Sequence, residues 1–348
     1  MVGEREYMDI RQIAEKAGVS VATVSRVQNH PETVAKATRE KVQAIIDECN
    51  YTPNWFARGM NIGKAETIGI IVPDILNPSY MEIIKGIEDI MAESGYITVI
   101  CDGSCDAQKE EDSINSLIKR NTDGLIIISS SISRQKLLSI KSKGIPIVSI
   151  GESNACKEID TVKIDYEKAS YKATKHLIDI GYDKIAIING PKEKRENALR
   201  LEGFKRALKN NNIKMEKDYI LHSKVSLDEG YLLTKKLLKL KNPPRAIFAT
   251  DDIFAFAAMA ALRDNNVKVP EDIAVIGFDN INLSRMIESK LTTVINPLHK
   301  QGVLGARLLI DIINNLESED SFTQEILLET KIKIRKSCGY GRRIGEIF

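Results

Sequence analysis

The sequence has few of the residues that build metal clusters or disulfide frameworks. Its 348 residues include five cysteines, four histidines and one tryptophan. A small, odd number of cysteines indicates reduced thiols rather than a set of disulfides. Cys101 and Cys105 are the closest pair, but neither has another Cys or His nearby at the spacing of a zinc site. We therefore expect neither a metal ion nor a cofactor.

Long apolar runs and a strong net charge are also missing. No apolar stretch reaches the length of about 18 residues that a membrane-spanning helix requires. The first residues, "MVGEREYMDI", are charged where a secretory signal is apolar. The net charge of +2 selects no class of partner by itself. These absences predict a cytoplasmic protein that has no membrane partner.

From Ile68 onward, short apolar segments alternate with amphipathic ones. The segments "TIGIIV", "GLIIIS", "KIAIING" and "IAVIGFD" are β-branched and lack polar alternation. This pattern is typical of parallel strands in an α/β protein, with helices covering both faces of the sheet. Roughly ten such strands, with a lull around residues 154–161, predict two sheets. A ligand cleft is expected between them, at the carboxyl ends of the strands. No nucleotide-phosphate loop motif is found.

The first sixty residues lack this rhythm and predict three short helices. Asp9 is a good N-cap, and Gln12 completes a capping box. Gly18 is placed to end the first helix in the left-handed conformation. Ser20 is positioned to cap the second helix, and a third is expected over about 36–48. A bundle this small is too small to be an enzyme.

The stretch "AGVSVATVSRV" is rich in β-branched residues, which favour strands. Val21, Val24 and Val27 nevertheless recur every three positions, which is helical spacing. We expect Val24 at the centre of an inner stripe, flanked by Val21 and Val27, because packing outweighs a small loss of helix propensity. Ala22 and Arg26 then face outward. Ala14, Gly18 and Val24 occupy the small, turn and core positions of a helix-turn-helix.

The outer face of this second helix suits the major groove of DNA. Arg26 can reach guanine, Val21 and Ala22 can meet thymine methyl groups, and Thr23, Ser25 and Asn29 can reach phosphates. An ordinary three-helix bundle with a solvated arginine is the alternative. It is favoured by the charge of residues 1–62, where eight basic side chains balance eight acidic ones, because DNA-binding domains usually carry a basic excess.

A resemblance decides between these interpretations. Residues 8–89 resemble the opening of a LacI/GalR-family transcriptional repressor. Their sequence is "MDIRQIAEKAGVSVATVSRVQNHPETVAKATREKVQAIIDECNYTPNWFARGMNIGKAETIGIIVPDILNPSYMEIIKGIED". The likeness continues through "HLIDIGYDKIAIINGP", "LRLEGF", "VPEDIAVIGFDN", "LTTV" and "IRKS". It implies a homodimer that binds a palindromic operator on double-stranded DNA, with a two-lobed sensor like the periplasmic sugar-binding proteins.

The resemblance also implies the domain boundaries. A helix-turn-helix DNA-binding domain is expected at 1–53, a hinge helix and linker at 54–65, and an effector-binding and dimerisation domain at 66–338, followed by a tail at 339–348. In the effector domain, the N-lobe would comprise about 66–161 and 293–322, and the C-lobe about 162–292 and 323–338.

Further DNA contacts are implied in the hinge. Asn54, Ala57, Arg58 and Met60 would form a short helix on the operator, with Met60 as the wedge between base pairs in the minor groove. A plain linker that happens to hold a methionine is the alternative.

The resemblance places the effector contacts at Ser79, Tyr80, Arg200, Asp251 and Asp279. Carboxylates and an arginine suit neighbouring hydroxyl groups, which favours a sugar or nucleoside. Lys192, Lys194 and Arg195 could admit a phosphate, although a solvated loop is preferred. Asp252 is expected to cap the helix that follows it.

These expectations describe a DNA-binding regulator, a repressor in the favoured version, whose operator affinity is switched by a small, carbohydrate-like effector. Three alternatives stay open: a family member controlled by a partner protein, a sugar-binding protein without DNA function, and a hydrolase using Asp251 and Asp279. We expect no enzyme, because no nucleophile–base pair or metal cluster accompanies those carboxylates.

Overall fold

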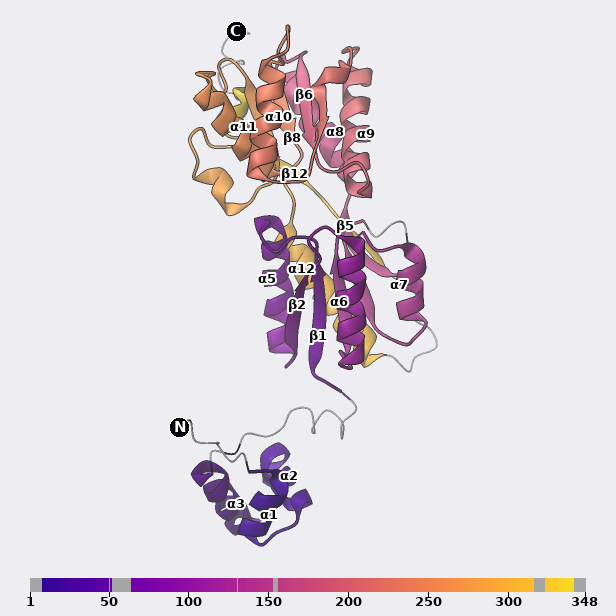
Figure 1. Cartoon of the computed structure of the whole chain (residues 1–348), viewed down its shortest axis with the longest axis vertical. Helices are drawn as coiled ribbons and strands as arrows, with labels where there is room; N and C mark the ends of the chain where they lie inside the picture. Colours follow the sequence, from indigo (N-terminus) through magenta and orange to yellow (C-terminus); the bar gives the residue numbers. More distant parts are fainter. Residues whose placement is uncertain are drawn as a thin grey trace. The chain divides into compact units, whose positions relative to one another are not determined.

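The computed structural model describes residues 8–49, 51, 64–129, 131–152, 156–315 and 323–340. The chain divides into two compact units, residues 1–65 and 66–348 (Figure 1). None of the helices in the described ranges combines the length and the hydrophobicity that a bilayer crossing demands.

The first unit contains three helices, as predicted: α1 (Ile10–Ala17), α2 (Val21–Asn29) and α3 (Lys36–Glu48), with a 3₁₀ turn at Pro31–Thr33. The Asp9 carboxylate accepts from the backbone N–H groups of Arg11 and Gln12, and the Gln12 side chain completes the capping box. Gly18 ends α1 with φ +65°, and the Ser20 hydroxyl caps α2. The predicted helix boundaries are confirmed.

The core of this unit is a small aliphatic cluster formed by all three helices. Its buried members are Ile13, Ala14, Ala17, Val24, Val27, Val42 and Ile46. The expected place of Val21 beside Val24 was wrong, because Val21 is 40% exposed. It is the first residue of α2, and its direction on the helix turns it away from the contact with α1 and α3. Val21 therefore joins the outward face.

The second unit holds two six-stranded sheets. The N-lobe sheet has the order β11-β5-β4-β3-β1-β2, with strands at Glu325–Leu328, Asp160–Ile164, Ile147–Ile150, Gly124–Ile128, Thr67–Val72 and Ile97–Asp102. The C-lobe sheet has the order β12-β10-β9-β8-β6-β7, with strands at Lys331–Lys333, Thr292–Ile295, Ala274–Asp279, Ala246–Ala249, Ile185–Asn189 and Ile220–His222. Neighbouring strands are parallel except for β10 and β12. The predicted α/β class with parallel sheets is confirmed.

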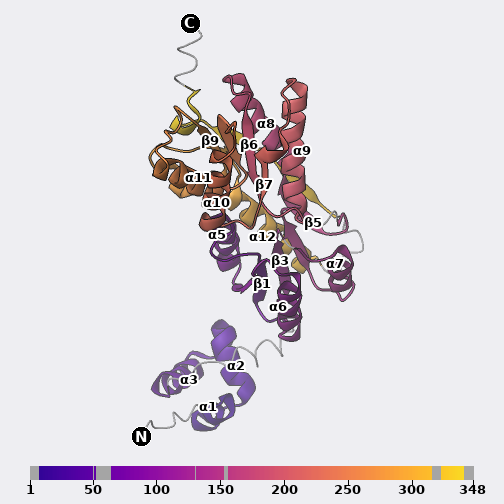
Figure 2. The same cartoon turned by 45° about the horizontal axis from the view of Figure 1, so that its top comes forward.

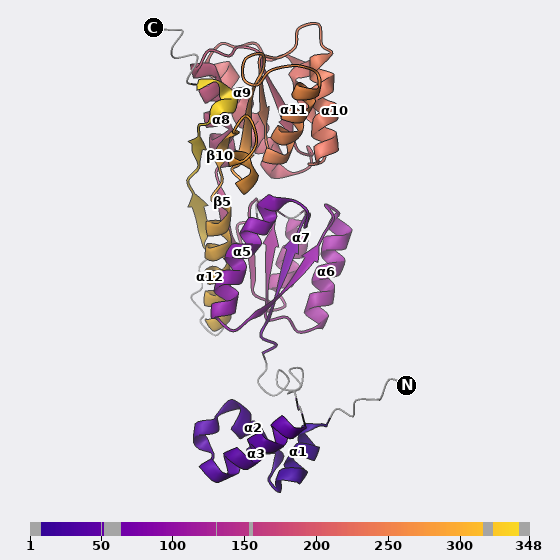
Figure 3. The same ribbon diagram turned by 90° about the vertical axis from the view of Figure 1, so that its left-hand side faces the viewer.

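Helices pack on both faces of each sheet. In the N-lobe, α5 (Pro78–Glu93) and α12 (Leu298–Asn314) cover one face, and α6 (Ala107–Lys119) and α7 (Arg134–Lys141) cover the other (Figure 3). In the C-lobe, α8 (Tyr166–Asp179) and α9 (Arg195–Asn210) lie side by side on one face (Figure 2). The opposite face is covered by α10 (Leu227–Leu238) and α11 (Asp252–Asp264).

The chain crosses between the lobes three times. The sheet changes after Ile164, after Ile295 and after Leu328, because β5 and β11 pair in the N-lobe sheet while β10 and β12 belong to the C-lobe sheet. These positions lie a few residues beyond the approximate boundaries expected at 161, 292 and 322. Each strand thus runs to its end before the chain enters the other lobe.

One edge strand of the N-lobe sheet is less buried than the central strands. The outer strand β2 exposes three aliphatic side chains, with Ile97 63%, Val99 40% and Ile100 39% exposed. Helices cover both faces of the sheet as predicted, but they leave much of this outermost strand exposed. A row of exposed aliphatic side chains on an edge strand is typical of an interaction surface.

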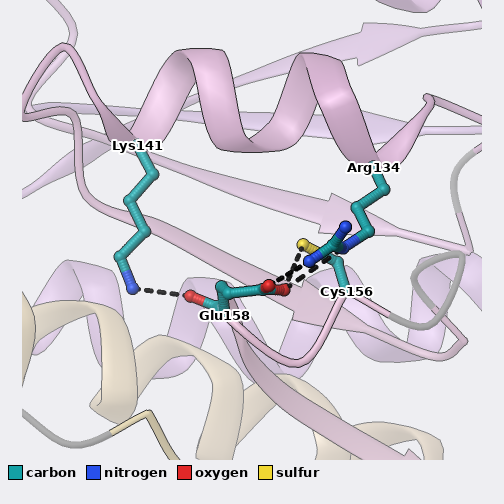
Figure 4. A network of polar contacts seen from close by, with 4 residues as sticks. All are labelled: Arg134, Lys141, Cys156 and Glu158. Atoms are coloured by element: carbon teal, nitrogen blue, oxygen red, sulfur yellow. Dashed lines mark hydrogen bonds and ion pairs between the residues drawn. The ribbon is translucent and has the colours of Figure 1, made fainter.

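A polar network fixes the segment that leads into β5 (Figure 4). The Glu158 carboxylate forms an ion pair with Arg134 at the start of α7, and its backbone oxygen accepts from Lys141 Nζ at 2.5 Å near the end of that helix. Cys156 Sγ lies 3.5 Å from Glu158 Oε2. The hydrogen bond from Arg134 lowers the pKa of Glu158, so the pair persists over the physiological pH range.

Prediction from the α5–α12 contact. These two helices touch at glycine, since a Cβ atom on Gly302 would lie 2.0 Å from the backbone oxygen of Ile83. The substitution Gly302→Ala should lower the free energy of unfolding by about 1–3 kcal/mol through overpacking, although alanine is the better helix former. Denaturant unfolding of the chain measures this. Arg307→Ala, on the exposed face of the same helix, should change little, and equal effects of the two substitutions would contradict the assignment.

Candidate functional site

A cavity of about 350 Å³ lies between the two lobes, where the carboxyl ends of the strands meet. Its lining includes every effector contact that the resemblance implied, from four different elements. Ser79 and Tyr80 lie in the first turn of α5, Arg200 lies on α9, and Asp251 and Asp279 follow β8 and end β9. Residues as far apart as 79 and 279 are therefore brought together in one site.

The two carboxylates accept hydrogen bonds from both lobes. The Asp279 carboxylate accepts from the Ser79 hydroxyl at 2.9 Å and from Asn296 Nδ2 at 2.9 Å. Asp251 accepts from Asn77 Nδ2 at 3.1 Å and from the backbone N–H of Ile253 at 2.8 Å. Since Asn77 and Ser79 belong to the N-lobe, each carboxylate links the lobes across the cavity.

The helix after β8 is capped by a different residue from the one expected. Asp251 is the N-cap of α11, whereas Asp252 is the first residue of that helix. Asp252 is fully buried, and its carboxylate accepts from the Thr293 hydroxyl at 2.6 Å and from the N–H of Ile281 at 3.0 Å. The expected capping role of Asp252 was therefore wrong. It joins α11 to the segment after β9 and to the start of β10 instead.

Two carboxyl groups of this cavity, those of Asp251 and Glu196, have raised pKa values. Burial, with a further contribution from the charge of Asp279, raises the pKa of Asp251 to about 7. Burial also raises the pKa of Glu196, although Lys194, its own backbone amide and Arg200 act in the opposite direction. The physical cause is desolvation, which penalises the charged form. At neutral pH Asp251 is therefore partly protonated.

Arg200 lies against two aromatic rings that stack on each other. Its guanidinium carbon lies 4.9 Å from the ring centre of Tyr166 and 4.6 Å from that of Phe278, and Nη1 donates to Asn197 Oδ1 at 2.9 Å. Its Nε atom is buried and has no hydrogen-bond partner among the described residues. A buried donor without a partner is costly, so this N–H is available for a ligand.

Sequence reasoning missed several lining residues, among them Asn77, Tyr166, Glu196, Asn197, Asn296 and Gln301. Asn296 directly follows strand β10, so the rule that ligands bind at the carboxyl ends of strands points to it. Asn77 carries the signal of an N-cap before Pro78. Nothing in the sequence distinguishes Glu196 from the other charged residues of its loop and helix.

The three basic residues near this rim have different environments. Lys194 lines the cavity, with Nζ 3.3 Å from the backbone oxygen of Ser129. Arg195 pairs with Glu152 at 3.5 Å, and Lys192 is exposed. These three side chains therefore do not converge on one phosphate-sized position. Within the part of the chain that the structure describes, no group of three His, Cys, Asp or Glu side chains is arranged to hold a metal ion.

The outward face of α2 forms the second candidate site. Val21, Ala22 and Arg26 are exposed on it, while Thr23 and Ser25 are half-buried. Asn29 donates to the backbone oxygen and the hydroxyl of Ser25 at 3.0 and 3.3 Å. The structure thus gives these predicted residues a common convex surface of helix size. The hinge residues Asn54, Ala57, Arg58 and Met60 lie outside the described residues.

Prediction from the carboxyl groups. The pKa of about 7 for Asp251 exceeds its ordinary value of 3.8, so the folded chain holds this proton more tightly than the unfolded chain. The second unit should lose stability as pH rises from about 4 to 7. Asp251→Asn keeps a capping oxygen and should therefore be more favourable at pH 8 than at pH 5. Thermal unfolding at both pH values measures the difference, and an equal effect of the substitution at the two values would refute this account.

Comparison with known proteins agrees with this architecture. The model for bacterial regulatory proteins of the lacI family matches residues 9–54, and the model for periplasmic binding proteins and the sugar-binding domain of the LacI family matches residues 65–335. Catabolite control protein A of Priestia megaterium is 34% identical over 329 residues, which are 94% of this chain and 98% of the relative. The transcriptional repressor PurR of Vibrio vulnificus is 33% identical, covering 89% of this chain and 93% of the relative. A structure of the transcriptional regulator CelR with cellobiose, 29% identical, covers 95% of this chain and 99% of its own with a TM-score of 0.71. The chain belongs to the LacI family of bacterial transcriptional regulators.

Proposed function

We propose that this regulator reads its operator with the outward face of α2. Arg26 contacts a guanine edge, Val21 and Ala22 meet thymine methyl groups, and Thr23, Ser25 and Asn29 contact phosphates. The observation that carries the proposal is that these side chains share one surface while Val24 and Val27 hold the helix to its bundle. The hinge residues Asn54, Ala57, Arg58 and Met60 would add minor-groove contacts.

The cavity is the effector site in this proposal, and its ligand is a small polyhydroxylated molecule. Paired carboxylates, asparagine amides and the free Arg200 Nε supply the acceptors and donors that hydroxyl groups need. The complex of a related regulator with cellobiose supports a carbohydrate-like ligand. The carboxylates bind this ligand and break no bond in it, so the chain acts as a regulator and not as an enzyme.

The switch in this proposal depends on the hydrogen bonds that join the lobes. A ligand that enters the cavity competes for, or adds to, the bonds of Asp251 and Asp279 with Asn77 and Ser79. It therefore changes the free energy of the arrangement in which these hydrogen bonds join the two lobes. Operator affinity changes only as far as the ligand binds the two arrangements differently.

A homodimer completes the proposal, since a palindromic operator needs two reading helices. The exposed aliphatic residues of β2 supply an apolar surface for a second copy, and Leu76, 85% exposed, lies in the same lobe. Burial of such side chains between two copies is favourable by roughly 25 cal/mol per Å² of apolar surface.

Prediction for the reading helix. Arg26→Ala should reduce affinity for the preferred duplex by about 10- to 100-fold and relax selection at one position of each half-site, because a bidentate contact to guanine is lost. The preferred duplex is obtained by selecting bound sequences from a random pool with the unaltered chain. Fluorescence anisotropy then measures the affinity of the unaltered chain and of the Arg26→Ala variant for this duplex.

Lys16→Ala is the matched control for that experiment. It also removes one positive charge from the first unit, but its Nζ lies 3.5 Å from Cys49 Sγ, near the end of α3. We expect at most a small, sequence-independent loss of affinity from it. Selection of the same sequence by the Arg26→Ala variant, with unchanged affinity, would exclude α2 as the reading helix.

Prediction for the dimer. Ile97→Glu places a charge on the exposed edge strand β2 and should shift the protein toward monomer in sedimentation experiments, with weaker operator binding as a consequence. Leu327→Glu is the control, because Leu327 is 56% exposed on β11, the opposite edge of the same sheet. If both variants sediment like the unaltered protein, β2 is not the dimer contact.

A further inference from the structure

The effector cavity buries more negative than positive charge. Three of its carboxyl groups are nearly inaccessible to water, with Glu196 6%, Asp251 8% and Asp279 5% exposed. Arg200 and Lys194 are the half-buried cations of the lining, which also holds the half-buried Asp74 and the exposed Asp102 and Lys224. The three buried acids exceed the two half-buried cations, so the interior carries at least one excess negative charge when every group is ionised.

The geometry does not balance these charges by ion pairing. Among the described residues, no Lys, Arg or His nitrogen lies within 4.0 Å of the carboxylates of Glu196, Asp251 or Asp279, as an ion pair requires. The donors to Asp251 and Asp279 are neutral amides and a hydroxyl. Arg200 instead stacks on Tyr166 and Phe278 and donates to Asn197. Unpaired buried carboxylates are costly, so they are retained where a ligand compensates them.

We propose that the effector is a cation, a polyhydroxylated molecule of monosaccharide size that carries a protonated amine, such as an amino sugar. Its ammonium group lies beside the carboxylates of Asp251 and Asp279, with Glu196 as a further buried acid of the same lining, and its hydroxyl groups use Asn77, Asn296 and the free Nε of Arg200. This inference rests on the proposed function, because it assigns the chemical class of the ligand of that same site.

Other features of the cavity agree with a small cation. Its volume of about 350 Å³ is at the lower end of ligand pockets, which suits a monosaccharide. Tyr80 lines it and adds an aromatic ring, and such rings attract ammonium groups. One positive charge on the ligand reduces the excess of negative charge.

A neutral sugar or a sugar phosphate fits these charges less well. Without a ligand cation, the excess charge is relieved by a proton, and the raised pKa values of Asp251 and Glu196 show that protonation is favoured there. A phosphate would add negative charge to the excess. Lys194 is the basic side chain of its loop that lines the cavity, while Arg195 is paired with Glu152.

The test compares matched sugars on the full chain by thermal shift and titration calorimetry at pH 7. The probes are glucosamine, galactosamine and mannosamine, the corresponding neutral hexoses, and the hexose 6-phosphates. At least one amino sugar should bind about tenfold or more tightly than its neutral partner, the scale expected for one close charge pair. Its 6-phosphate counterpart should bind more weakly than either.

Charge-neutral variants test which groups provide this selectivity. Glu196→Gln and Asp251→Asn should each reduce the preference for the amino sugar over the neutral hexose by about tenfold. Glu202→Gln removes the same charge from an exposed position on the same helix as Arg200 and should leave the preference unchanged. Unfolding of each unliganded variant verifies that the second unit is intact.

Each outcome decides the question. A neutral hexose or a phosphate that binds as tightly as the amino sugars, or a failure of all three amino sugars to bind, overturns the charge assignment. Operator binding is measured separately with the same probes. A neutral hexose that releases or strengthens the operator would leave the proposed function standing while this inference fails. An amino sugar that binds without changing operator affinity would support the charge assignment and contradict the proposed function.

Discussion

The second unit depends on hydrogen bonds that reach across its cleft to two buried carboxylates. Asp279 receives the Ser79 hydroxyl and Asp251 receives the Asn77 amide, so each acid at the end of a C-lobe strand is linked to the first turn of the N-lobe helix α5. Hydrogen bonds to charged acceptors are stronger than neutral ones, especially where water is excluded. In the proposed function, the atoms that hold the lobes together are therefore the same atoms that the effector would contact.

This arrangement couples ligand contacts to the scaffold. Asp251 is at once a cavity residue and the N-cap of α11, and its neighbour Asp252 ties that helix to Thr293 and Ile281. Asp251 and Asp252 thus connect the cavity to the start of α11 and to strand β10. Three crossings between the lobes allow one to move relative to the other without breaking either sheet. In the proposed function, a ligand that altered these few hydrogen bonds would therefore favour one arrangement of the lobes over the other.

The sequence predicted the features that local chemistry decides. The capping box at Asp9, the turn at Gly18 and the parallel strands follow from residue type and spacing, and the resemblance supplied the five cavity residues. Features that depend on tertiary contacts were not predictable. Val21 and Val27 are each three residues from Val24. Val21, however, is the first residue of α2 and is 40% exposed, whereas Val27 is buried. Asp251 and Asp252 are chemically identical, and the backbone at the end of β8 determines which of them caps α11.

The buried carboxylates are best understood as a stability cost that function requires. A neutral side chain at Glu196 or Asp251 would remove a desolvated charge from the interior, and natural proteins keep such groups mainly where binding depends on them. Asp251 and Asp279 each accept from two neutral donors, which supply hydrogen bonds but no opposite charge. Burial raises the pKa values of Glu196 and Asp251, so in the proposed complex a cationic ligand would favour the ionised forms of these two groups. Their charge distinguishes this cavity from one built for hydroxyl groups alone, where amides would serve as well at lower cost.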